Sequence, residues 1–222
     1  MQNWSWINPY ITKINRFSGK VVLEATPSGL IQSDRERLKQ LINKFSEVFL
    51  EIGSGSGGHL LARAKARPEA LFVGIELRYK RLCRTAEKAE KEQIENILLI
   101  KQDARFVDLI FKPRSLAGIY VYFPDPWSEK RRWLKHRLLN ESYCSKLFEL
   151  LKDGGFISFK TDDHNYYEYV KRNFLNLTSK VIDLSNSDSN SYINDLKNGF
   201  YSEFERLFIS KGIKIYKLLV NK

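Results

Sequence analysis

The chain has 222 residues, and its 37 Lys and Arg against 26 Asp and Glu give a formal charge of +11 at pH 7. This length suits one α/β domain, and the charge favours an anionic partner such as nucleic acid. No apolar run is long enough to span a membrane, and the first ten residues lack the pattern of a signal peptide, so we expect a cytoplasmic protein that does not enter the membrane.

Cysteine and histidine are too few and too scattered to suggest a metal. Cys83 and Cys144 lie far apart in predicted helices, which is typical of reduced packing residues in a cytosolic protein. No set of Cys and His has the spacing of a zinc site. We therefore expect no metal, and the sequence leaves open whether the protein is a monomer or a homodimer.

The first 47 residues differ from the rest. They begin with an arm that has no clear period and whose aromatic and basic residues are Trp4, Trp6, Tyr10, Arg16, Phe17 and Lys20. A helix should follow, capped by Ser33 or Asp34. Its apolar face would carry Leu38, Leu41, Ile42 and Phe45. The sequence thus predicts an N-terminal arm and helix over 1–47 and a larger domain over 48–222.

From Val48 onward, short apolar runs alternate with helical patterns. The predicted strands are Val48–Ile52, Leu71–Glu76, Ile97–Lys101, Gly118–Phe123, Phe156–Lys160 and Ile213–Val220. The predicted helices are Leu60–Ala66, Arg78–Glu92, Arg137–Leu151, Asn165–Phe174 and Ser202–Lys211, the last stopped by Gly212. We expect a turn at Asp153–Gly155 and a loop at Asp183–Gly199. This alternation predicts an α/β fold with a doubly wound, mostly parallel sheet.

A glycine-rich loop follows the first of these strands. Gly53, Gly55 and Gly58 satisfy the pattern Gly-x-Gly-x-x-Gly, in which glycines let the backbone turn sharply and approach a ligand. By itself the pattern is weak, because it also occurs in nicotinamide-dependent oxidoreductases. The loop therefore indicates a cofactor site without naming the cofactor.

Three acids stand at the ends of successive strands around that loop. Glu51 precedes the loop, Glu76 ends the second strand, and Asp103 follows the third. Such acids can simply cap the next helix, and Glu76 also fits a ribose in a nicotinamide dinucleotide site. An acid beside the loop would repel a pyrophosphate, however, whereas S-adenosylmethionine has a sulfonium and an amino group and no phosphate. The three acids together favour S-adenosylmethionine.

The fourth strand ends in Tyr122-Phe123-Pro124-Asp125-Pro126-Trp127. Two prolines should hold Asp125 at the carboxyl end of the strand, where open α/β sheets bind ligands. A basic run follows: Lys130, Arg131, Arg132, Lys135, His136 and Arg137. A fixed acid, an aromatic ring and a cationic track suggest chemistry on a nucleic-acid base. The alternatives are a turn with a solvated basic helix, or an RNA-binding protein that has lost its activity.

Taken together, these segments resemble one family. The loop from Glu51 to Gly57, Gly74-Ile75-Glu76, Asp103-Ala104, the Pro-Asp-Pro-Trp segment and Lys160-Thr161-Asp162 closely resemble the tRNA (guanine-N7-)-methyltransferases. The resemblance runs from about Val48 to the end. It implies a class I methyltransferase (Rossmann-like) fold with an N-terminal extension, a catalytic domain over 48–222, S-adenosylmethionine as donor, and a guanine in the tRNA variable loop as acceptor.

The resemblance also implies roles for single residues. The cofactor-site residues would be Glu51, Gly53, Glu76, Asp103 and Asp125, and Asp125 would be catalytic as well. The substrate-site residues would be Lys130, Asp162, Ser202 and Glu205. Two positions depart from the family: Ser202 replaces a threonine, and Glu129 stands where the family has a lysine. We expect that one extra residue in the basic run turns Glu129 outward on a helix and lets Lys130 replace the lysine.

Overall fold

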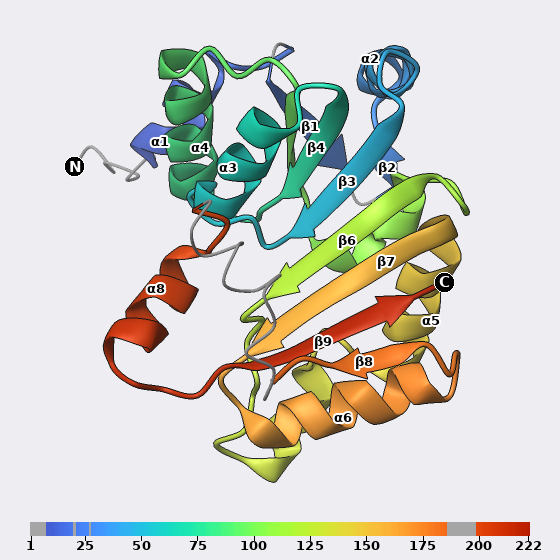
Figure 1. Cartoon of the computed structure of the whole chain (residues 1–222). Coiled ribbons are helices and arrows are strands. Elements are labelled where there is room, and N and C mark those ends of the chain that lie inside the picture. The colour runs from blue at the N-terminus through green and yellow to red at the C-terminus, as the bar shows by residue number, and fades with distance from the viewer. Residues whose placement is uncertain (1–7, 20, 27, 186–198) are drawn as a thin grey trace, which may run out of the picture.

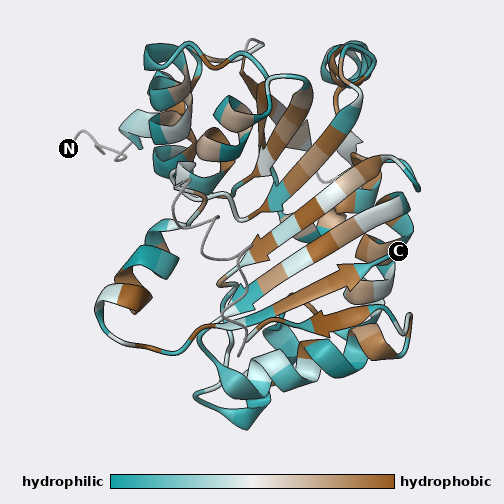
Figure 2. Ribbon diagram, viewed as in Figure 1, coloured by the Kyte–Doolittle hydropathy of each residue, from teal (hydrophilic) through white to brown (hydrophobic). Residues whose placement is uncertain are grey.

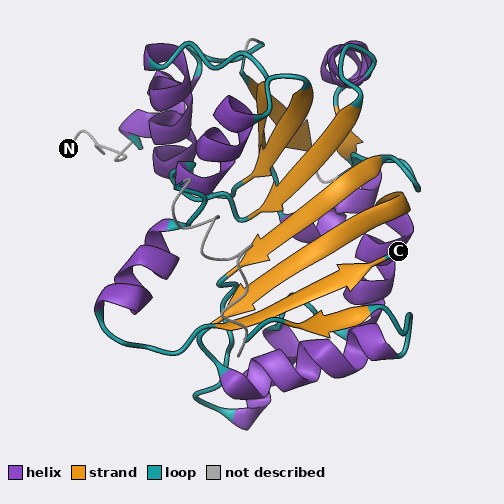
Figure 3. Cartoon of the chain, viewed as in Figure 1, coloured by secondary structure: helices purple, strands orange, loops and turns teal. Residues whose placement is uncertain are grey.

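The protein is described here from a computed structural model, which describes residues 8–19, 21–26, 28–185 and 199–222. One sheet runs through the molecule, with helices on both of its faces (Figure 1, Figure 3). The helices are α1 (Pro9–Ile14), α2 (Gln32–Ile42), α3 (Gly58–Ala66), α4 (Tyr79–Lys91), α5 (Glu141–Leu150), α6 (His164–Leu175) and α8 (Glu203–Ser210), with two 3-10 helices, η1 (Ala104–Leu109) and η2 (Arg131–His136).

The strands are β1 (Val22–Thr26), β2 (Gly29–Leu30), β3 (Glu47–Ile52), β4 (Ala70–Ile75), β5 (Ile97–Lys101), β6 (Leu116–Tyr122), β7 (Leu151–Thr161), β8 (Val181–Asp183) and β9 (Tyr216–Asn221). Their order in the sheet is β2-β1-β5-β4-β3-β6-β7-β9-β8. All pairs from β1 to β7 are parallel, and β2, β9 and β8 add antiparallel edges. The predicted doubly wound, mostly parallel sheet is confirmed.

The sheet separates two apolar cores. In β3, Val48, Leu50 and Ile52 pack on the side of α2, α5 and α6, while Phe49 packs on the side of α1, α3 and α4. Figure 2 shows the apolar strands between helices whose outer faces are hydrophilic. Because side chains alternate along a strand, Glu51 lies on the same face as Phe49 and points toward α3.

The N-terminal part contains elements that the sequence did not reveal. Strand β1 pairs with β5 and extends the sheet, and α1 and β2 were not predicted either. Outside the N-terminal part, β8 was also not predicted. Trp4, Trp6 and Lys20 of the predicted arm lie outside the described residues, as do residues 186–198 of the predicted loop. The division between 47 and 48 stays a prediction.

Several predicted boundaries were wrong. Helix α2 begins at Gln32 after Ile31, with no side-chain cap, so neither Ser33 nor Asp34 is the cap. Helix α5 begins at Glu141, because the Asn140 side chain accepts a hydrogen bond from the Tyr143 amide at 2.9 Å. Residues 153–155, predicted as a turn, lie inside β7 at an irregularity in its register with β6. The left-handed stop at Gly212 is confirmed, with φ of 66°.

Candidate cofactor and substrate site

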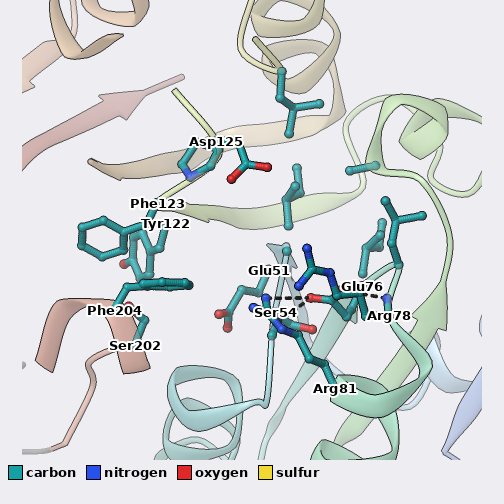
Figure 4. Close-up of a pocket in the computed structure, with 18 of the residues that line it drawn as sticks. Glu51, Ser54, Glu76, Arg78, Arg81, Tyr122, Phe123, Asp125, Ser202 and Phe204 are labelled. Atoms are coloured by element: carbon teal, nitrogen blue, oxygen red, sulfur yellow. Dashed lines mark hydrogen bonds and ion pairs between the residues drawn. The ribbon is translucent and has the colours of Figure 1, made fainter. Parts of the chain in front are cut away.

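A cavity of about 490 Å³ opens at the carboxyl ends of the parallel strands β3, β4, β5 and β6. Its wall includes all four predicted cofactor-site acids: Glu51, Glu76, Asp103 and Asp125. The N-terminal end of α8 closes one side through Ser202, Glu203 and Phe204. In Figure 4, Asp125 faces Glu51 and Glu76 across the cavity, and Phe123 and Phe204 lie together at its side. The strand ends thus bring together residues far apart in the sequence.

The glycine loop forms the floor near β3. Gly53 and Gly55 have φ of 71° and 57°, which favours glycine, and neither would meet a backbone clash on the cavity side if it carried a Cβ. Gly57, which the pattern did not single out, is also left-handed, and a Cβ there would lie 2.3 Å from Thr85 Cγ2. Packing against α4 therefore fixes the loop, whereas its inner face is left for a ligand.

Glu51 is held by a buried chain of hydrogen bonds. Its Oε2 lies 3.0 Å from His59 Nδ1, and Arg63 Nε donates to His59 Nε2 at 3.2 Å. Because the guanidinium only donates, Nε2 must accept and Nδ1 must carry the proton that bonds Glu51. Sequence reasoning missed His59. The signal that could have found His59 was its place on the first turn of α3, eight residues after Glu51.

Glu76 is buried and binds the loop that it faces. The Gly55 amide donates to its Oε2 at 3.1 Å, and the Arg78 amide donates to Oε1 at 2.8 Å. Arg81 lies 3.8 Å from the same Oε2. Glu76 therefore shapes the glycine loop as well as supplying negative charge to the cavity.

Asp103 is engaged by a neighbour. Both of its oxygens accept hydrogen bonds from the Arg105 guanidinium, at 2.5 to 3.1 Å. These bonds hold the pKa of the Asp103 carboxyl below its usual value. Since the Arg105 side chain is largely exposed, it can turn away without disturbing the core.

Asp125 sits on a loop with unusual backbone angles. Phe123 and Trp127, on either side of Pro124-Asp125-Pro126, have φ of 52° and 51°, which is rare for aromatic residues. The Asp125 side chain is exposed, and the described residues give its carboxylate neither a hydrogen bond nor an ion pair. The loop thus holds a free acid at the mouth of the cavity.

The basic run divides into an exposed part and a buried part. Lys130, Arg131, Arg132 and Lys135 are exposed. Two residues of the same segment line the cavity: Trp127, which is 39% exposed, and His136. Arg137 is buried, 7% exposed, and donates to the Pro126 carbonyl at 2.8 Å. The Arg137 guanidinium is thus turned into the protein, away from the exposed cations of the run.

The local structure also corrects the argument about Glu129. Neither Glu129 nor Lys130 lies in a helix, because η2 begins only at Arg131 and is a 3-10 helix. A rotation of about 100° per residue therefore does not apply to this pair. Lys130 is nevertheless exposed, with its Nζ 4.8 Å from the centroid of the Trp133 ring.

The remaining predicted substrate residues occupy different places. Asp162 is exposed after β7 and does not line the cavity. Ser202 lines the cavity and caps α8, accepting a hydrogen bond from the Glu205 amide at 3.1 Å. Glu205 is fully buried, and both of its oxygens lie 2.9 Å from Lys160 Nζ. A direct contact between Glu205 and a substrate is therefore disfavoured.

Two further properties of the described residues concern metal-binding clusters and membrane-spanning helices. Within the described ranges, no cluster of three His, Cys, Asp or Glu side chains could hold a metal ion. None of the described helices has both the length and the apolar character needed to cross a membrane.

Comparisons with known proteins agree with this site. A family model described as "Putative methyltransferase" matches residues 46–218. The tRNA (guanine-N(7)-)-methyltransferase of Listeria monocytogenes serotype 4b is 34% identical over 203 residues, which cover 88% of this chain and 91% of that protein.

Solved structures match the fold. An antibiotic-related methyltransferase has a TM-score of 0.61 and 16% identity, covering 86% of this chain and 94% of that one. A 30S ribosomal A1408 methyltransferase from an uncultured bacterium has a TM-score of 0.58 and 20% identity, and the match covers 89% of this chain and 98% of that one. The chain has the class I methyltransferase fold and belongs to the tRNA (guanine-N(7)-)-methyltransferase family.

Proposed function

We propose that this protein transfers a methyl group from S-adenosylmethionine to N7 of a guanine in the variable loop of tRNA. The observation that carries the proposal is the arrangement of four acids around one cavity, with exposed cations and an aromatic ring beside its mouth. Membership of the family supports the reaction and the class of acceptor. The position in the variable loop rests on the resemblance alone.

The residues of the cavity suit S-adenosylmethionine. Its amino group and sulfonium are cationic, so the carboxylates of Glu51 and Asp125 favour it, and Glu76 offers oxygens to ribose hydroxyls. Gly53 brings the backbone close to the ligand, and Asp103 is placed to accept from the adenine amine once Arg105 turns away. A pyrophosphate would meet several of these negative charges, which disfavours a nicotinamide dinucleotide.

Asp125 is proposed as the catalytic residue because of what guanine needs. N7 has an in-plane lone pair and no proton, so the site requires alignment and negative charge rather than a strong base. When bound, S-adenosylmethionine supplies the methyl group on a sulfonium. The Asp125 carboxylate is free to accept hydrogen bonds from guanine N1–H and the exocyclic amine, and its charge offsets the positive charge that methylation creates.

The acceptor guanine must leave its stack to enter the cavity. Trp127 and Phe204 are exposed at the mouth and offer rings for it, and Ser202 offers a hydroxyl on the same side. Lys130 and Asp162 are proposed to contact the RNA outside the cavity. Glu205 is proposed to act through the position of α8, since it is bonded to Lys160.

The test is to map N7-methylguanosine in tRNA after incubation with the purified protein and S-adenosylmethionine. Reduction and aniline cleavage break the chain at the modified base, so we expect one new cleavage, in the variable loop. Asp125→Ala should remove it while the thermal midpoint stays unchanged. Cleavage elsewhere would refute the position, and methyl label on protein with tRNA untouched would refute the function.

A further inference from the structure

Arg137 lies at the centre of a small network beneath the loop that carries Asp125. Its Nε donates to the carbonyl oxygen of Pro126 at 2.8 Å, and its Nη2 donates to Ser128 Oγ at 3.2 Å. Ser128 Oγ in turn donates to Asp163 Oδ2 at 2.5 Å. Pro126 directly follows Asp125, so the guanidinium is hydrogen-bonded to the residue next to the free acid.

The network is anchored in the rigid part of the domain. Asp163 caps α6, accepting a hydrogen bond from the Tyr166 amide at 2.6 Å. The guanidinium carbon of Arg137 lies 4.7 Å from the centroid of the Tyr166 ring and 5.4 Å from that of Tyr169. Both rings belong to α6, so Arg137 links the loop to a helix that packs on the sheet.

The loop needs such an anchor. Aromatic residues at positive φ are strained, and they keep that conformation only where surrounding contacts enforce it. Phe123 is fixed by a hydrogen bond from its amide to the Lys160 carbonyl at 2.8 Å. On the other side of Asp125, the bonds from Arg137 to Pro126 and Ser128 flank Trp127, the second strained residue.

We propose that Arg137 is a positioning residue for methyl transfer: it holds the Pro126 carbonyl and Ser128 and thereby fixes Asp125 at the cavity mouth. The inference rests on the proposed function, because methylation of a guanine is the reaction for which Asp125 would have to be held in place. It also separates Arg137 from its exposed neighbours in the basic run, which face solvent rather than the loop.

Lysine would not replace this arginine. The planar guanidinium donates in two directions at once and stacks on aromatic faces, whereas an ammonium is a point charge with strong hydration. Arg137→Lys therefore keeps the charge and loses the two-armed geometry. Arg172→Lys is the matched control, because Arg172 lies 5.9 Å from the centroid of the same Tyr169 ring but is exposed on the outer side of α6.

The experiment compares these variants in four measurements: S-adenosylmethionine affinity, the salt dependence of tRNA binding, the single-turnover methylation rate with both ligands saturating, and amide hydrogen exchange of residues 122–130. For Arg137→Lys we expect a rate at least tenfold lower and faster exchange in 122–130, with cofactor affinity and salt slope as in wild type. Arg172→Lys should match wild type throughout. Arg131→Gln should lower the salt slope, which identifies a phosphate contact.

The inference is overturned if Arg137→Lys lowers the salt slope as Arg131→Gln does and keeps the wild-type rate and exchange. It is also overturned if Arg137→Lys matches wild type in every measurement. Should Arg137→Lys not fold, Ser128→Ala decides: a rate at least threefold lower with faster exchange supports the network, and wild-type values refute it. If wild type itself does not methylate tRNA, the proposed function fails, while the exchange data still report whether Arg137 holds the loop.

Discussion

Of the residues proposed to form the substrate site, Glu205 should be the one whose substitution lowers the stability of the protein most, because it is paired with buried Lys160. Glu205 is fully buried, the Lys160 side chain is 5% exposed, and both carboxylate oxygens lie 2.9 Å from Nζ. Removing one partner of a buried pair costs about 3–5 kcal/mol, because the other charge stays buried after it has lost its counter-ion. The Tyr122 ring, 4.4 Å from Nζ, contacts the Lys160 ammonium in wild type and variant alike, so it does not change this difference. Glu205→Gln should therefore destabilise the protein by about 3–5 kcal/mol.

Urea unfolding of four proteins tests this value: wild type, Glu205→Gln, Lys160→Met and the double variant Lys160→Met/Glu205→Leu. Each single variant should be less stable than the double, since replacing both charges with apolar groups of similar size leaves neither uncompensated. Because Glu205 belongs to α8, limited proteolysis of residues 199–215 should also increase in the single variants. A Glu205→Gln protein within about 0.5 kcal/mol of wild type, with α8 equally protected, would refute the reasoning.

Three further outcomes follow from the site. Glu76→Gln should weaken S-adenosylmethionine binding at least tenfold in calorimetry, because charge-assisted hydrogen bonds are worth about 1.5–3 kcal/mol each, and wild-type affinity would remove Glu76 from the site. Affinity for tRNA should fall with salt by a log–log slope of about 0.7 to 0.9 per neutralised phosphate, and the double variant Arg131→Gln/Arg132→Gln should lower the slope; a flat dependence would mean that these cations contact no phosphate. Lys130→Ala should raise the apparent KM for tRNA, whereas Glu129→Ala should leave it unchanged or lower it; the reverse result would show that Lys130 does not replace the lysine of the family.

The sheet and the cavity were predictable from the sequence because they depend on local patterns. Short apolar runs separated by helical periods define a parallel sheet, and acids placed directly after the runs must then meet at one edge. Glu51, Glu76, Asp103 and Asp125 were found in this way, although they are spread over 75 positions of the chain.

Residues whose role depends on distant partners were not predictable. Arg137 is the last cation of a run that otherwise faces solvent, and it is held inside by the rings of Tyr166 and Tyr169 on α6 together with hydrogen bonds to Pro126 and Ser128. Glu205 was expected to touch substrate, but its partner Lys160 lies 45 residues earlier on β7. Strand β1 was also missed: it has only five residues, and its short apolar start, Val22-Leu23, did not stand out from the arm, whereas its pairing with β5 defines it in the structure.

The most direct test of the function compares two tRNA transcripts that differ in one atom of each guanine. One transcript carries guanosine, and the other carries 7-deazaguanosine, in which a carbon replaces N7 and no lone pair can accept the methyl group. With labelled S-adenosylmethionine, the protein should transfer label to the guanosine transcript and none to the 7-deaza transcript, while both compete equally for binding. Transfer of label to the 7-deaza transcript would contradict methylation at N7.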